Sequence, residues 1–129
     1  MNSQVKINAP QNLGAEALND LIVDSIQDIK GKRIVKLDLR KVADAPTDYF
    51  IVCEGDSNTQ VKGIADNIQK RLKEEAGIRP VHVEGERHAR WICIDYFNTM
   101  VHIFYRETRT FYELEDLWSD ARFTEYDAL

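Results

Sequence analysis

The chain has 129 residues, which suits a single domain, and its 43% hydrophobic and 30% charged residues are typical of a soluble globular protein. Its net charge of -5 disfavours a broad nucleic-acid-binding surface, in which many Lys and Arg side chains neutralise phosphates, and favours a basic protein partner. No apolar run of about 18 residues could span a membrane and no apolar block of a signal peptide is present, so we expect the cytosol or an organelle interior.

Three segments are expected along the chain. Residues 1–12 are polar and predict a flexible N-terminal tail. Residues 13–121 carry the apolar patterns of secondary structure and are expected to form a single domain. Residues 122–129 are expected to be an acidic C-terminal tail.

The first half of the domain predicts one helix and two strands. Apolar residues at helical spacing predict a helix within Leu13–Ile29. The alternation in Arg33–Leu39 predicts a strand in which Ile34 and Val35 lie on opposite faces. Tyr49–Cys53 is continuously apolar, which indicates a strand covered on both faces.

The second half begins with a helix that Ser57 or Asn58 can cap and that ends at Gly77. Val81–Glu84 predicts a short strand. Further along, a helical stripe over Phe111–Trp118 predicts a terminal helix.

Between these elements, Arg90–Arg106 predicts an antiparallel hairpin, because two aromatic and β-branched runs flank a short polar break. Side chains alternate between the two faces of a strand. The purely apolar face, expected to be the core side, consists of Ile92, Ile94, Val101 and Ile103. The opposite face carries Trp91, Asp95 and His102.

The order of these elements predicts an α/β (α+β) domain with a five-stranded mixed sheet. Each helix has a single apolar stripe, so the helices are expected to pack mainly on one face of the sheet. Part of the other face is then expected to stay open, with Trp91, Asp95 and His102 on it. A large aromatic beside ionisable groups is typical of a recognition surface, and an ordinary half-exposed sheet face looks the same.

Isolated residues give weak signals for catalysis or metal binding. Gly55–Ser57 before a helix could bind a phosphate, but a turn with a helix cap is the favoured interpretation. Asp38 and Asp48 lack the spacing of a two-metal site. Cys53 and Cys93 lie in apolar runs and are expected to be buried free thiols. We therefore predict no catalytic residue, no metal site and no cofactor.

His102 lies in the middle of the predicted hairpin among apolar neighbours. A hydrogen-bonded structural histidine is the default interpretation, and an exposed imidazole close to Asp95 is the alternative. No Ser or Cys has the sequence context of an activated nucleophile, which argues against a catalytic role for the histidine.

Several short phrases, spread over nearly the whole domain, share their order and spacing with one protein family. They are Asp48–Val52 with Gly55 and Ser57, Ile64–Asp66, Glu84–Gly85, Ala89 with Trp91, Asp95–Tyr96, Val101–Phe104, and Phe111–Tyr112 with Leu114–Glu115 and Leu117–Trp118. On these phrases the chain resembles the ribosomal silencing factor family, also called Iojap-like, from roughly Leu18 to Ala121.

The resemblance implies a cytoplasmic protein that is not an enzyme. Such proteins bind the large ribosomal subunit through a basic ribosomal protein (uL14) on its subunit-joining face. They block joining of the small subunit sterically and repress translation when nutrients are short, whereas organelle relatives serve large-subunit assembly. The family fold resembles the nucleotidyltransferase fold without its catalytic carboxylates.

The resemblance also implies a partner-binding set. The family's contact surface falls on Trp91, Asp95 and Tyr96, and its histidine falls on His102. The following turn adds Asn98 as a candidate contact. We expect Trp91 to be the anchor of a protein–protein contact and Asp95 to pair with Lys or Arg of the basic partner.

The turn itself departs from the family pattern. Where the family usually has Gly-Asp, this chain has Phe97–Asn98. The turn must form without its glycine, and we expect Asn98 to take the positive φ, since Asn tolerates it.

Two other classes of function remain open. One is a nucleotidyltransferase-like enzyme that uses Ser57 and scattered carboxylates, and Mg²⁺-dependent ATP binding would favour it. The other is a structural homodimer that pairs an exposed hairpin edge.

Overall fold

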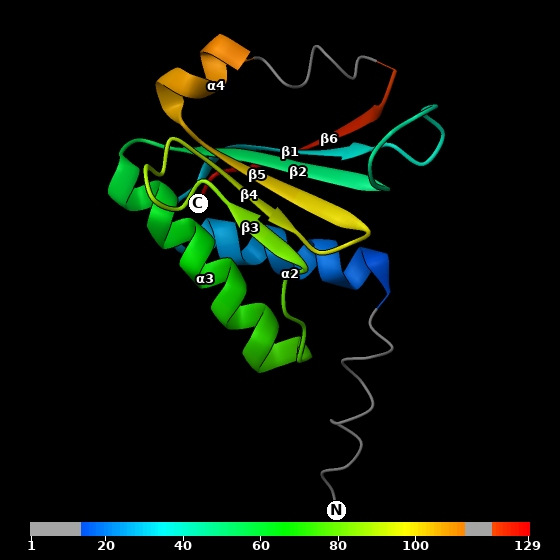
Figure 1. Cartoon of the computed structure of the whole chain (residues 1–129), viewed down its shortest axis with the longest axis horizontal. Coiled ribbons are helices and arrows are strands. Elements are labelled where there is room, and N and C mark those ends of the chain that lie inside the picture. Colours follow the sequence, from blue (N-terminus) through cyan, green and yellow to red (C-terminus); the bar gives the residue numbers. More distant parts are fainter. Residues whose placement is uncertain (1–13, 113–119) are drawn as a thin grey trace, which may run out of the picture.

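The computed structural model describes residues 14–112 and 120–129, which form one sheet with helices on both of its faces (Figure 1). The helices are α2 (Ala15–Asp28), α3 (Asn58–Ala76) and α4 (Arg106–Tyr112). The strands are β1 (Lys32–Asp38), β2 (Tyr49–Gly55), β3 (His82–Glu84), β4 (Trp91–Asp95), β5 (Thr99–Tyr105) and β6 (Arg122–Tyr126). The predicted N-terminal tail, residues 1–12, lies outside the described residues.

The sheet has the strand order β3-β4-β5-β2-β1-β6, and only β2 and β5 run parallel. The mixed sheet of an α+β fold is confirmed, but the strand count of five is wrong. The sixth strand, β6, consists of Arg122–Tyr126, which the sequence pattern had assigned to an acidic tail. Its side chains are mostly exposed, so it lacks an apolar pattern and is held by pairing with β1. The expected nucleotidyltransferase-like topology stays a prediction.

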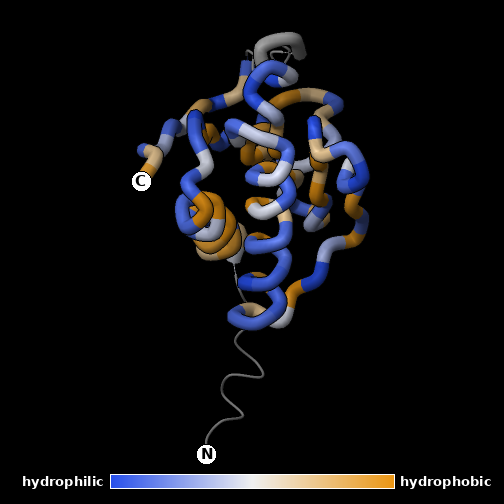
Figure 2. The backbone as a smooth tube through the Cα atoms, turned by 90° about the vertical axis from the view of Figure 1, so that its left-hand side faces the viewer, coloured by the Kyte–Doolittle hydropathy of each residue, from blue (hydrophilic) through white to orange (hydrophobic). Residues whose placement is uncertain are grey.

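The larger hydrophobic core lies between the sheet and the pair α2 and α3, which Figure 1 shows together on one side of the strands. The hairpin contributes the four residues expected on its core side: Ile92, Ile94, Val101 and Ile103. Figure 2 shows that α3 is hydrophilic along most of its length, while α2 beside it is more hydrophobic. Helix α3 therefore contributes a single apolar stripe and presents charged residues to solvent.

A second, smaller core covers part of the opposite sheet face. Its buried members are Val35, Leu37, Leu39, Phe50, Val52, Phe104 and Ala121. The expected open face is therefore restricted to the β3–β4 side of the sheet. Ile34 and Val35 lie in different cores, as predicted, and every residue of β2 is buried, which confirms a strand covered on both faces.

The predicted ends of α3 are confirmed. The Ser57 hydroxyl oxygen accepts a hydrogen bond from the Gln60 backbone N–H at 3.0 Å, so the cap interpretation of this turn holds. Gly77 adopts a left-handed conformation with φ of 66°, which closes the helix. The last helix, α4, begins at Arg106, earlier than predicted, and residues 113–118 of the predicted helix lie outside the described residues.

A buried ion pair connects β2 to α4. Glu54 and Arg109 are only 3% and 1% exposed, and Arg109 Nη1 lies 3.5 Å from Glu54 Oε1. The same Nη1 donates to the Arg33 carbonyl oxygen at 2.5 Å, and Arg33 Nη1 lies 3.2 Å from Glu54 Oε1. Because a charge is stable in a protein interior only when it is paired and hydrogen-bonded, this cluster fixes α4 against the sheet.

Candidate partner-binding surface

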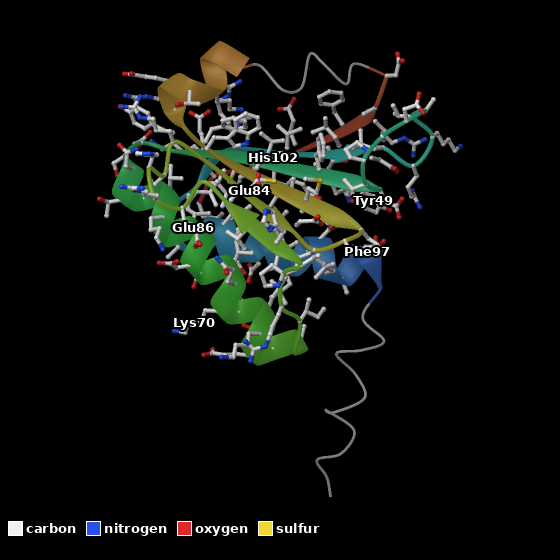
Figure 3. The ribbon with its side chains drawn as sticks, viewed as in Figure 1. Tyr49, Lys70, Glu84, Glu86, Phe97 and His102 are labelled. Carbon is white, nitrogen blue, oxygen red and sulfur yellow. The ribbon has the colours of Figure 1, made fainter. Side chains whose placement is uncertain are left out.

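The uncovered part of the sheet is built by three strands. Glu84 faces Cys93 and His82 faces Asp95 across β3 and β4, while Asp95 faces Met100 across β4 and β5. Directly opposed residues point to the same face of a sheet. We call this surface the hairpin face, and define it by the exposed or half-exposed residues His82, Glu84, Trp91, Cys93, Asp95 and Met100. In Figure 3, Glu84 lies on this part of the sheet and Phe97 lies at the hairpin tip.

Trp91 is the largest residue of the hairpin face and is half-buried. Its indole N–H donates to Nδ1 of His102 at 3.1 Å, and its ring stacks on Phe104 with centroids 5.0 Å apart. The hydrogen bond and the stacking fix the orientation of the indole. A large aromatic residue that is already ordered loses little entropy when a partner covers it.

His102 is a buried structural histidine, 5% exposed, beneath Trp91. Its ring contacts Phe50 edge to face with centroids 4.6 Å apart, and it lies opposite Cys93 in the strand register. The alternative of an exposed imidazole close to Asp95 is therefore wrong, and the default interpretation is confirmed. Burial lowers the pKa of His102 to about 4, so the imidazole is neutral and Nδ1 can accept the Trp91 N–H.

The buried imidazole makes stability depend on pH. Because the unfolded histidine gains a proton near pH 6.5 and the folded one only near pH 4, acid favours the unfolded state within this window. We expect the free energy of unfolding to fall by about 2 kcal/mol between about pH 7 and about pH 5. Urea unfolding measured across this range checks the slope. The variant His102→Gln should lose most of it, whereas His88→Gln, at an exposed position, should keep it.

Asp95 shapes the turn that follows it. Its Oδ1 accepts the Phe97 backbone N–H at 2.7 Å, and its carbonyl oxygen accepts the Val81 N–H at 2.7 Å. Within the described residues, no hydrogen bond reaches its Oδ2. One carboxylate oxygen therefore holds the turn, and the other remains available to a cation on the half-exposed hairpin face.

Phe97, rather than Asn98, takes the positive φ of the turn, with a value of 76°, so the expectation for Asn98 is wrong. The reason is that both backbone groups of Phe97 are held: its N–H by Asp95 and its carbonyl oxygen by the Thr47 hydroxyl at 2.9 Å. The Phe97 side chain is 75% exposed. Phe97 was not among the predicted contact residues, although an aromatic residue where the family usually has glycine marks this position.

Replacing Phe97 with glycine should stabilise the protein. A left-handed backbone is strained for phenylalanine and relaxed for glycine, and the exposed ring contributes little packing. We expect the free energy of unfolding to rise by about 1 kcal/mol, which a shift of the urea midpoint would show. Asn98→Gly is the matched control and should not stabilise, because Asn98 has no positive φ. A destabilised Phe97→Gly variant would show that the turn is not strained.

Tyr96 lies apart from the other candidate contacts. It is 5% exposed and belongs to the larger core, on the face opposite to Trp91. Burial raises the pKa of its hydroxyl above the ordinary range. Of the five predicted contact residues, the structure leaves Trp91, Asp95 and Asn98 accessible at least in part and places Tyr96 and His102 inside.

The side chains of Asp38 and Asp56 make structural contacts. Asp38 pairs with Arg40 at 2.7 Å, and that guanidinium lowers the pKa of the carboxyl to about 2. Asp56 pairs with Lys32 at 2.6 Å. Within residues 14–112 and 120–129, no group of three or more His, Cys, Asp or Glu side chains could hold a metal ion. No helix in this described part is long and apolar enough to cross a membrane.

A family model described as "Ribosomal silencing factor during starvation" matches residues 12–129. The chain is 34% identical over 114 residues to the ribosomal silencing factor RsfS of Halalkalibacterium halodurans, covering 88% of this chain and 96% of that one. It is 37% identical over 107 residues to the RsfS of Chromobacterium violaceum, covering 83% and 86%. In mouse, a protein named mitochondrial assembly of ribosomal large subunit protein 1 is 33% identical over 75 residues, 57% of this chain and 33% of that protein.

Solved structures agree with these matches. A crystal structure of a Chromobacterium violaceum protein superposes with a TM-score of 0.78 at 36% identity, covering 82% of this chain and 87% of the other. A Bacillus halodurans structure superposes with a TM-score of 0.73 at 33% identity, covering 86% and 99%. The fold described above is therefore shared by similar sequences of known structure.

Proposed function

Because the chain belongs to the ribosomal silencing factor family, we propose that it binds the large ribosomal subunit and blocks its association with the small subunit. The contact is a basic ribosomal protein, uL14, on the subunit-joining face. The protein acts in the cytoplasm and represses translation when nutrients are short. It does this without catalysis and without a cofactor, since occupying the joining face is sufficient.

The observation that carries this proposal is the composition of the hairpin face. It combines three half-exposed apolar residues, Trp91, Cys93 and Met100, with the carboxylates of Glu84 and Asp95. His82 lies 3.0 Å from Glu84, whereas Asp95 has no ion-pair partner within the described residues. Apolar area beside charged groups is usual for a protein–protein interface, and the free carboxylate supports a basic partner, whose association electrostatic attraction would also speed up.

Within this surface we assign two kinds of role. Trp91, Asp95 and Asn98 touch the partner, while His102 positions the indole from beneath and Tyr96 supports the strand from the core. Phe97 joins the contact residues, because its aromatic ring is 75% exposed and its backbone has a positive φ, and strained positions cluster at functional sites. Phe97→Gly should then separate the two properties, by raising stability and weakening binding.

The mouse relative favours a second candidate function, since its name refers to assembly of the large subunit of the mitochondrial ribosome. An assembly factor would bind immature large subunits in preference to mature ones. The homodimer through an exposed strand edge also stays a prediction, and light scattering across protein concentrations would test it.

A subunit-joining experiment tests the proposed function. Purified large subunits are incubated with the protein, small subunits are added, and the joined ribosomes are separated by sucrose-gradient sedimentation. We expect the protein to sediment with large subunits and the joined fraction to fall as protein is added. Large subunits that do not bind the protein, or that still join small subunits normally with the protein bound, would contradict the proposal. Binding confined to immature subunits would favour the assembly function.

A further inference from the structure

A second surface of opposite charge lies on the helical side of the molecule. A pocket of about 420 Å³ lies between the C-terminal half of α3 and the segment that leads into β3. We call it the cationic pocket, and it is lined by Gln69, Lys70, Lys73, Arg79 and Pro80. Figure 3 shows Lys70 on α3, away from the part of the sheet that carries Glu84.

The three cations of this pocket are not neutralised by the protein. Within the described residues, no carboxylate forms an ion pair with Lys70, Lys73 or Arg79, and none lines the pocket. Seven other cationic side chains do form such pairs: Lys32, Arg33, Arg40, Lys62, Arg71, Arg106 and Arg109. In a chain with a net charge of -5, three unpaired cations around one concavity form a local site for an anion.

The nearby acidic side chain Glu86 does not neutralise the cations of the pocket. Its carboxylate lies 3.4 Å from the Gln69 amide and 3.8 Å from Lys62, and it is not among the lining residues of the pocket. Helix capping does not explain the cations either. The carbonyl oxygens of Leu72 and Lys73 already accept backbone N–H groups from Ile78 and Gly77.

The geometry suits a phosphate-bearing ligand. Lys70 and Lys73 are three residues apart and share one face of α3, and Arg79 approaches from the facing segment. Lysine contributes a point charge, whereas arginine offers a planar fork that matches phosphate oxygens. Charges on two sides of a concavity can contact successive phosphates of one strand.

We infer that the cationic pocket binds backbone phosphates of RNA on the large ribosomal subunit, as a second contact in addition to the one made by the hairpin face. This inference rests on the proposed function, since the subunit supplies the RNA. A ribosomal surface presents basic protein next to phosphate backbone, and the two surfaces of this chain carry the complementary charges. The pocket carries only three cations, so it adds a local contact and does not need the broad basic surface that the net charge of -5 disfavours.

The test compares two double variants with the same change of charge. Lys70→Gln/Lys73→Gln removes two pocket cations, and Lys30→Gln/Lys41→Gln removes two exposed cations elsewhere. The Kd for purified large subunits is measured over a series of salt concentrations. We expect the pocket variant to bind about 10-fold more weakly at low salt, with a salt slope smaller by about 1 to 2, and the control to behave as wild type.

A crosslinking arm identifies the ligand. A photo-reactive benzoylphenylalanine at position 70 is irradiated on large subunits, and the adduct is treated with ribonuclease. An adduct that ribonuclease shortens supports RNA, whereas an adduct to ribosomal protein overturns the RNA assignment. Equal Kd and salt slope for the two double variants overturns the pocket while leaving the proposed function intact. If the wild-type protein does not bind large subunits, both the RNA-binding pocket and the proposed function are overturned.

Discussion

Replacing Trp91 with alanine is expected to weaken binding to the large ribosomal subunit by about 30-fold or more, which corresponds to about 2 kcal/mol. The indole is the largest side chain of the hairpin face, and its hydrogen bond to His102 and its stacking on Phe104 fix it before binding. Truncation to alanine removes the apolar contact area of a side chain whose orientation is already fixed before binding. The joined fraction in the subunit-joining experiment should return toward its level without protein.

Two controls make this result interpretable. Phe123→Ala removes another partly exposed aromatic, 40% exposed, from β6 at the opposite edge of the sheet, and should leave binding unchanged. Circular dichroism and urea unfolding establish that the Trp91→Ala protein is folded, since the indole also packs in the smaller core. If the folded variant binds large subunits and blocks joining as well as wild type, Trp91 is not the anchor.

Replacing Arg109 with methionine should destabilise the fold by about 3–5 kcal/mol. Methionine keeps much of the volume of the arginine stem but leaves the Glu54 carboxylate without its buried counter-charge. It also removes the hydrogen bond from Nη1 to the Arg33 carbonyl oxygen. The remaining cation near Glu54 is Arg33, whose side chain is 60% exposed and therefore compensates only in part. Urea unfolding at neutral pH measures the loss.

The neighbouring Arg106 offers a matched control. Its guanidinium lies 3.7 Å from Asp56, and both side chains are substantially exposed, so Arg106→Met should change the unfolding free energy by less than about 1 kcal/mol. The double variant Arg109→Met/Glu54→Gln also removes the unpaired Glu54 carboxylate and should recover part of the lost free energy of unfolding. An Arg109→Met protein as stable as the Arg106→Met protein would show that the buried pair is not needed.

Sequence periodicity was sufficient to predict the helices and strands that bury apolar side chains. The alternation in the hairpin assigned Ile92 and Ile103 to the core, and the separation of Ile34 from Val35 placed those residues in two different cores. These predictions succeeded because the side-chain period of a strand is fixed by covalent geometry. The strand β6 was missed because backbone pairing with β1, rather than apolar burial, holds it.

The contact residues were predictable only in part, because sequence gives the face of a strand but not the depth of burial. Tyr96 shares a face with Ile94, yet family resemblance placed it among the contacts, and the structure buries it. The positive φ of Phe97 depends on a hydrogen bond that its N–H donates to Asp95 and on one that its carbonyl oxygen accepts from Thr47, which lies 50 residues away along the chain. The Glu54–Arg109 pair is equally non-local, and no short sequence pattern marks it.

The parallel pairing of β2 with β5 has a consequence for how quickly the molecule reaches its native state. These two strands form the middle of the sheet, yet they are separated along the chain by α3, β3 and β4. The antiparallel pairs β1–β2 and β4–β5 can each form early from neighbouring segments, but the two halves must then meet in register. Closing that long loop is entropically unfavourable until the contacts form, so we expect folding to be slower than for a helical bundle of similar length.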